Sequence, residues 1–148
     1  MSLKEQLQTD WKLALKARDT FKSSVLNMAK ASIINEEKNK GSDLTDDEIV
    51  DIISKEVKMR RDAIIEFEKG NRQDLVDSSN EEISILLGYL PQQLTENEIA
   101  EIVNNVVNEL GAKDIKDMGK VMSKVNPITK GRADGKLVSQ IVKYYLSK

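Results

Sequence analysis

Hydrophobic residues recur along this chain at intervals of three and four positions, which is the period of an amphipathic α-helix. The segments before, between and after the only two prolines, Pro91 and Pro127, follow this period and not the alternation typical of strands. The pattern therefore predicts an all-α protein.

Capping signals and glycines place the ends of the expected helices. Thr45 and Glu48 have capping-box spacing, and so have Thr95 and Glu98. We expect helices after Ser2, from about residue 20 to Gly41, from Thr45 to Gly70, over about 81–89 and 96–110, and near 117–125 and 134–147. Among the positions expected to face inward are Leu15, Met28 and Leu110.

The stretch "GYLPQQLTENE" predicts a boundary, because proline ends the preceding helix and a capping box starts the next one. We therefore expect an N-terminal helical bundle over residues 1–92. Residues 93–148 should form a small three-helix domain, of a size at which independent stability is possible but modest.

Composition narrows the chemistry that the chain can support. Of its 148 residues, 39% are hydrophobic and 32% charged, and there is no cysteine or histidine. Disulfides, thiol nucleophiles, Cys/His zinc sites and histidine acid/base pairs are thereby excluded. The start is charged and no apolar run approaches the roughly 18 residues of a membrane span, so we expect a cytoplasmic protein with no membrane contact.

The charge is distributed unevenly. Residues 1–110 contain 14 Lys/Arg and 22 Asp/Glu, whereas residues 111–148 contain 9 and 3. A basic tail on an acidic body predicts a polyanion or an acidic protein surface as partner. The candidate RNA-binding cations are Lys120, Lys124, Lys130, Arg132 and Lys136.

Glycines accompany these cations in "DMGKVMSKVNPITKGRADGK". Gly131 can adopt positive φ in the turn, Asp134 can cap the last helix, and Gly119 and Gly135 leave two helix starts without a side chain. Exposed backbone N–H groups beside lysines form a plausible phosphate site. The same residues also fit a tight helix–helix turn with a solvated face, and charge alone favours that simpler interpretation.

The segments "DMGKVMSKV" and "KGRADGKLVSQIVKYYL" resemble the YqeY-like proteins, as do "LTDDEIVDIISKEVKMRRDAI" and "YLPQQLTENEI" in the N-terminal half. The C-terminal region of that family is similar to the tail of the B subunit of the tRNA-dependent amidotransferase. The resemblance implies an all-helical fold with a three-helix C-terminal domain. It also implies tRNA as a partner, together with an amidotransferase or an aminoacyl-tRNA synthetase, and no DNA.

Catalysis is not expected of the chain itself. Ser23 and Ser24 follow Lys22 inside an amphipathic helix and lack the glycine-rich setting of a strained nucleophile. No phosphate-binding glycine loop occurs, and the acids around Asp46 do not have the spacing of a calcium loop, so we expect no cofactor and no metal. Any carbon-nitrogen ligase activity with glutamine as amido-N-donor, which the resemblance suggests, would belong to a larger complex. A helical adaptor that binds protein and not RNA is the alternative function.

Overall fold

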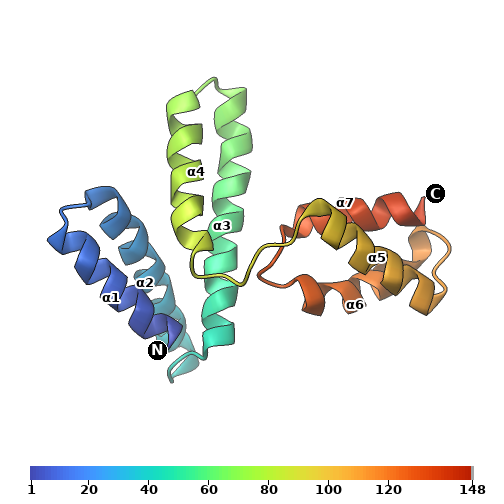
Figure 1. Ribbon diagram of the computed structural model, residues 1–148, viewed down its shortest axis with the longest axis horizontal. Helices are drawn as coiled ribbons and strands as arrows, with labels where there is room; N and C mark the ends of the chain where they lie inside the picture. Colours follow the sequence, from blue (N-terminus) through green and yellow to red (C-terminus); the bar gives the residue numbers. More distant parts are fainter. Residues whose placement is uncertain (148) are drawn as a thin grey trace. The chain divides into compact units, whose positions relative to one another are not determined.

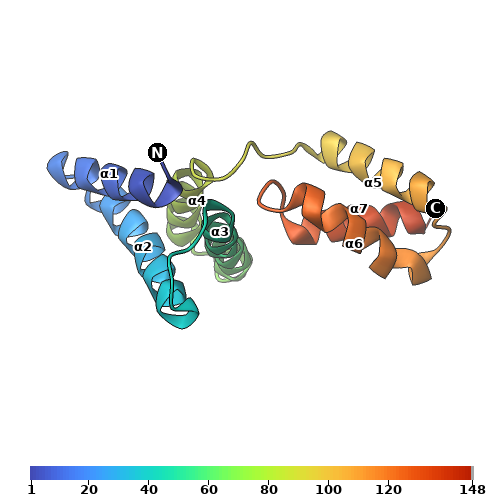
Figure 2. The same ribbon diagram turned by 90° about the horizontal axis from the view of Figure 1, so that it is seen from below.

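The computed structural model describes residues 1–147, which contain seven α-helices, one short 3₁₀ helix and no strand (Figures 1 and 2). The predicted all-α class is confirmed. The chain divides into two compact units, Met1–Leu90 and Pro91–Lys148. The predicted boundary after residue 92 lies close to this division, and each unit has a hydrophobic core of its own.

The N-terminal unit consists of two helical hairpins (Figure 1). Its helices are α1 (Leu3–Lys16), α2 (Thr20–Lys40), α3 (Asp46–Lys69) and α4 (Gln73–Leu87). Residues from all four helices meet in one core, in which Leu7, Leu26 and Ile53 are fully buried. This burial supplies most of the unit's stability, since each such side chain contributes about 1.5–3 kcal/mol.

The C-terminal unit is a three-helix bundle in which each helix packs on the other two. Its elements are α5 (Glu96–Leu110), η1 (Ile115–Asp117), α6 (Met118–Thr129) and α7 (Gly135–Leu146). Valines at helical spacing form the centre of its core, including the fully buried Val103, Val121 and Val142. Packing of these three stripes fixes where the α6–α7 turn lies.

Both predicted capping boxes are present. The Thr45 hydroxyl accepts from Glu48 N at 3.3 Å while Glu48 Oε1 accepts from Thr45 N at 3.1 Å. Thr95 and Glu98 make the same reciprocal pair at 3.1 and 3.0 Å. Each box satisfies two backbone donors that the helix start leaves without a partner, so α3 and α5 begin where the sequence predicts.

Two predicted helix bounds are wrong. α4 begins at Gln73 and not near residue 81, because Val76 and Ser79 are buried and extend the inward stripe into a run that looks polar. α6 continues to Thr129 and contains Pro127 in its last turn. The Thr129 hydroxyl donates to Val125 O at 3.2 Å inside the core, which holds this turn helical beyond the proline.

Three side chains expected to face inward are exposed instead. Leu15, Met28 and Leu110 have exposed fractions of 49%, 52% and 37%. Leu15 and Met28 lie on the edges of their helices' apolar stripes, where the period of the sequence alone does not show which edge a neighbouring helix covers. Leu110 is the last residue of α5, directly before the C-cap Gly111.

A hydrogen bond between Tyr89 and Asp10 ties the end of the N-terminal unit to α1, with Tyr89 Oη donating to Asp10 Oδ2 at 2.5 Å. Burial raises the pKa of Tyr89 well above its usual value, and the Asp10 carboxylate adds to this. The stabilisation is thus present below the unfolded pKa of about 10 and is lost as pH rises above it.

We predict that Tyr89→Phe lowers the free energy of unfolding at pH 8 by about 1–2 kcal/mol, since a hydrogen bond to a charged group is removed. Urea titrations at pH 8 and pH 10.5 check this. The wild type should lose more stability than the variant between the two values, and parallel losses would contradict the assignment.

Candidate nucleic-acid interface

The turn between α6 and α7 is held by the segment that precedes α5. Gly131 has φ of 73°, a left-handed conformation that favours glycine. Its carbonyl accepts from Gln93 Nε2 at 2.8 Å, and Arg132 O accepts from Leu94 N at 2.8 Å. Two hydrogen bonds from a distant segment therefore fix the backbone of a turn that the sequence presents as a simple connection.

Arg132 belongs to this anchorage. The residue is half-buried, and its Nε donates to Gln92 O at 3.3 Å. The pKa of Glu98 is lowered chiefly by the Thr95 N–H, and the positive charge of Arg132 contributes to the same shift. Arg132 thus uses part of its hydrogen-bonding capacity inside the unit, so we treat it as a residue that positions the turn as well as a cation beside it.

All three carboxylates in residues 111–147 accept hydrogen bonds from backbone amides. Asp114 Oδ1 accepts from Lys116 N at 2.8 Å, Asp117 Oδ2 from Lys113 N at 3.0 Å, and Asp134 Oδ1 from Lys136 N at 3.2 Å. The Lys113 N–H is the main cause that lowers the pKa of Asp117. These acids therefore cap local structure, and a cap's negative charge is partly offset by the backbone donors around it.

The candidate lysines come from α6, from α7 and from the turn between them. Lys120 and Lys124 share a flank of α6, and this flank faces α5 because Lys124 Nζ lies 3.2 Å from Glu109 Oε1. Lys136 lies on the exposed side of α7, away from the buried Val138 and Val142. Lys130 is exposed at the C-cap of α6.

The candidate glycines lie on open surface. Gly119 is the second residue of α6 and Gly135 is the first of α7, and both are exposed. A Cβ built on either would meet no heavy atom within 4 Å. Packing inside the unit therefore does not require glycine at these two positions, unlike Gly131, whose backbone conformation does.

Charge is separated within the C-terminal unit. Residues 91–148 contain 9 Lys/Arg and 7 Asp/Glu, and α5 carries four of these acids. The unit as a whole is thus only weakly basic, while its η1–α7 part is strongly basic. A long anionic ligand would meet attraction on one side and repulsion on the other, which would orient it.

Sequence reasoning missed Gln92 and Gln93, whose main-chain and side-chain groups hold the turn. The signal available was the pair of polar residues between Pro91 and Leu94, shortly before the Thr95 cap. No set of three or more Asp and Glu residues in the described part of the chain is arranged to hold a metal ion. The hydroxyl of Ser23, which the sequence raises as a possible nucleophile and which we do not expect to act as one, donates a hydrogen bond to Thr20 O at 3.1 Å within α2.

These features define a helical protein with a small C-terminal bundle and a fixed basic turn. The chain belongs to the YqeY-like family: the family model described as "Yqey-like protein" matches residues 4–146. The match covers both units, so the resemblance noted in the sequence is confirmed at the level of the family.

Relatives named "Altered inheritance of mitochondria protein 41, mitochondrial" are similar to this chain. The one from Pyrenophora tritici-repentis is 31% identical over 91% of this chain and 76% of its own length. Those from Lachancea thermotolerans and Kluyveromyces lactis are 36% and 34% identical, over 70% and 56% of this chain. The matches span 57% and 45% of these two relatives, about half of their length.

The cytoplasmic location predicted from the sequence is contradicted by these names, which describe mitochondrial proteins. The prediction rested on a charged start and on the lack of a long apolar run, and neither property distinguishes one compartment from another. Among residues 1–147, no helix combines the length and apolar character needed to cross a bilayer.

Proposed function

We propose that the protein is a non-catalytic accessory module that binds structured RNA, and most specifically tRNA, through the basic side of its C-terminal unit. The observation that carries this proposal is the use of Asp114, Asp117 and Asp134 as caps. Because these acids bind backbone amides, they neutralise the surrounding lysines only in part, and the remaining positive charge can attract phosphates.

Phosphate and shape contacts fit this surface better than base reading. Lysine acts as a mobile point charge and carries no sequence information when it contacts phosphate. Tyr144 is exposed, and its ring meets that of Tyr145 edge-on at 5.6 Å. With Lys120, Lys130 and Lys136 spread over two helices and a turn, the expected ligand is a folded RNA, whose backbone can reach several of them.

The resemblance to the amidotransferase tail suggests where such binding is used. An amidotransferase or an aminoacyl-tRNA synthetase would supply the catalytic site, including any carbon-nitrogen ligase chemistry with glutamine as donor. This chain would retain or orient the tRNA. The names of the relatives state neither a ligand nor a reaction, so the proposal rests on the C-terminal unit and on that resemblance.

A protein adaptor is the second candidate, and the exposed Ile115, Ile128 and Leu110 on the C-terminal unit favour it. Apolar side chains at a surface contribute more to protein than to RNA contacts. A tagged full-length chain would then retain its partner after nuclease treatment. Partners released by nuclease support the RNA proposal.

The two open glycines give a specific test. We predict that the double variant Gly119→Ala, Gly135→Ala folds with stability equal to the wild type or up to about 1 kcal/mol higher, since alanine favours helix. Its affinity for a tRNA pool should fall about fivefold, because methyl groups would hinder close approach of phosphates to the helix starts.

Fluorescence anisotropy with labelled tRNA measures the affinity, and thermal unfolding serves as the control for folding. Tight binding by the wild type and weaker binding by the alanine variant support the proposal. Absence of tRNA binding by the wild type, or unchanged affinity in the variant, contradicts the proposed contact.

A further inference from the structure

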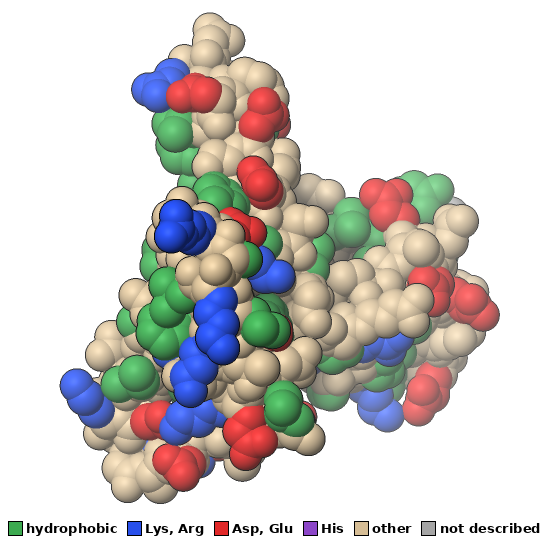
Figure 3. Space-filling view, turned by 60° about the vertical axis from the view of Figure 1, so that its left-hand side comes forward, with side chains coloured by type: hydrophobic (Ala, Val, Ile, Leu, Met, Phe, Trp, Pro, Cys, Tyr) green, Lys and Arg blue, Asp and Glu red, His purple; other side chains and the backbone are tan. Residues whose placement is uncertain are grey.

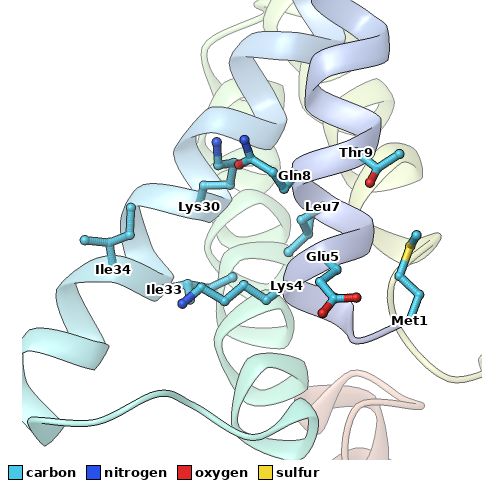
Figure 4. Close-up of a pocket in the computed structure, with 9 residues that line it drawn as sticks. All are labelled: Met1, Lys4, Glu5, Leu7, Gln8, Thr9, Lys30, Ile33 and Ile34. Carbon is cyan, nitrogen blue, oxygen red and sulfur yellow. The ribbon is translucent and has the colours of Figure 1, made fainter.

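The N-terminal unit carries an apolar groove over α1 and α2 that neither hairpin fills. Leu7 and Ile33 form its floor, Ile34 and Met1 contribute exposed walls, and Lys4 and Lys30 reach over it (Figure 4). Its volume is about 590 Å³. Grooves of this size and apolar character are typical of binding sites.

A stripe of side chains, polar at Lys4 and Gln8 and apolar at Trp11 and Leu15, continues from the groove along α1. Lys4, Gln8, Trp11 and Leu15 follow one another at intervals of four, three and four residues, so they lie on one side of the helix. At the α-helical rise this stripe is about 16 Å long, or three turns. A ligand that covers it must be elongated, as a helix is.

Positive charge lines the same surface. Lys30 Nζ lies 3.7 Å from the centre of the Trp11 ring, and burial lowers the pKa of Lys30, with the charge of Lys12 adding to the effect. Two lysines thus lie close enough to repel each other. Figure 3 shows Lys and Arg side chains in a column on this side of the unit, with hydrophobic side chains on both sides of it.

The nearby acids do not cancel this charge. Glu37 is bound to Lys4 at 2.8 Å and also accepts from Leu44 N at 3.2 Å, so its charge is engaged at Lys4. Glu5 is the acid among the residues that line the groove, and it lies on the α1 side, away from Lys30 (Figure 4). The positive charge around Lys12 and Lys30 is therefore left to attract an external anion.

We propose that this groove binds an amphipathic helix of a partner protein, with the helix's apolar stripe on Ile34, Trp11 and Leu15 and its flanking carboxylates beside Lys12 and Lys30. An apolar groove bordered by cations is complementary to such a helix in both shape and charge. This site is independent of the RNA contact proposed for the C-terminal unit.

Other occupants fit less well. RNA binds through phosphate contacts and gains little from an apolar groove, and Lys30 covers one face of the chain's single tryptophan, which hinders base stacking there. A second copy of this chain would have to offer an acidic amphipathic helix, but α5, the acidic helix of the C-terminal unit, uses Ile99 and Val103 in its own core. The occupant is therefore a helix from another protein.

Synthetic helices test the site on the full-length chain. The probe is a fluorescein-labelled peptide of about 18 residues, long enough to cover the stripe, with leucines on one face and glutamates on both flanks. The matched peptide has lysines in place of the glutamates. We expect the acidic peptide to bind at least tenfold more tightly than the basic one and to change the emission of Trp11.

Two variants locate the contact. Ile34→Asp should weaken binding of the acidic peptide about tenfold or more, because it places a like charge in the apolar groove. The control is Ile65→Asp on α3, since Ile34 and Ile65 have nearly equal exposed fractions of 45% and 44%. Unchanged binding by the control supports the proposal.

Three results would overturn it: equal affinity for both peptides, equal losses in the two variants, or no peptide binding together with saturable binding of dodecanoate or of a short RNA that Ile34→Asp abolishes. The last result would assign the groove to a different class of ligand. Because tRNA binding is measured separately, failure here leaves the RNA proposal unaffected.

Discussion

The triple variant Lys120→Glu, Lys130→Glu, Lys136→Glu should bind tRNA about 100-fold more weakly than the wild type at 0.1 M salt. Each lysine lies in the part of the chain where the acids serve as caps, so each reversal removes an attraction and adds a repulsion. The dependence of affinity on salt should become shallower by about three counterions, because three lysines no longer bind phosphates.

Arg132 is left out of this variant on purpose. Its side chain donates to Gln92 O, so replacing it would disturb the turn as well as the charge. A matched control reverses three exposed lysines of the N-terminal unit, Lys22, Lys55 and Lys58. The control should retain most of the affinity; equal reductions in both variants would show that only net charge matters and would contradict a defined interface.

Arg60→Met should lower the free energy of unfolding of the N-terminal unit by about 3–5 kcal/mol, because it leaves buried carboxylates without their cation. Arg60 Nη1 lies 2.8 Å from Glu56 Oε2 and donates to Glu56 O at 3.0 Å. Its Nε lies 3.6 Å from Glu82 Oε2, an ion pair beyond hydrogen-bond distance. Ser32 Oγ donates to Glu56 Oε1, which joins α2 to the same network.

The burial of this network makes the effect large. The side chains of Arg60, Glu56 and Glu82 have exposed fractions of 10%, 14% and 24%. Urea titration followed by circular dichroism measures the loss of stability, and the less buried neighbour Arg61→Met is the control. Adding Glu56→Gln and Glu82→Gln to Arg60→Met should restore part of the stability. A loss below about 1 kcal/mol would show that the carboxylates are hydrated and that the network is not structural.

Local rules were sufficient for most of the fold. The Thr95 capping box and Gly111 define α5 from the sequence, because the chemistry of both ends lies within a few residues. The local rules failed where tertiary packing decides which residues are buried. The start of α4 depends on burial of Val76 against other helices, and the exposure of Leu15 and Met28 depends on where the second hairpin packs.

The candidate site shows the same division. The cap at Asp134 and the left-handed conformation of Gly131 follow from residue type and local spacing. The bonds of Gln92 and Gln93 to the turn join residues about forty positions apart, as no local pattern can show. The pairing of Lys124 with Glu109 likewise follows from the packing of α6 on α5.

The central claim is that the C-terminal unit recognises folded RNA through its lysines, and a competition titration tests it most directly. Anisotropy of labelled tRNA would be followed with the full-length protein from about 50 to 300 mM salt, with duplex DNA of equal charge as competitor. We predict salt-dependent binding that DNA displaces poorly. Absence of binding at the lowest salt, or displacement by DNA as effective as by unlabelled tRNA, would contradict the claim.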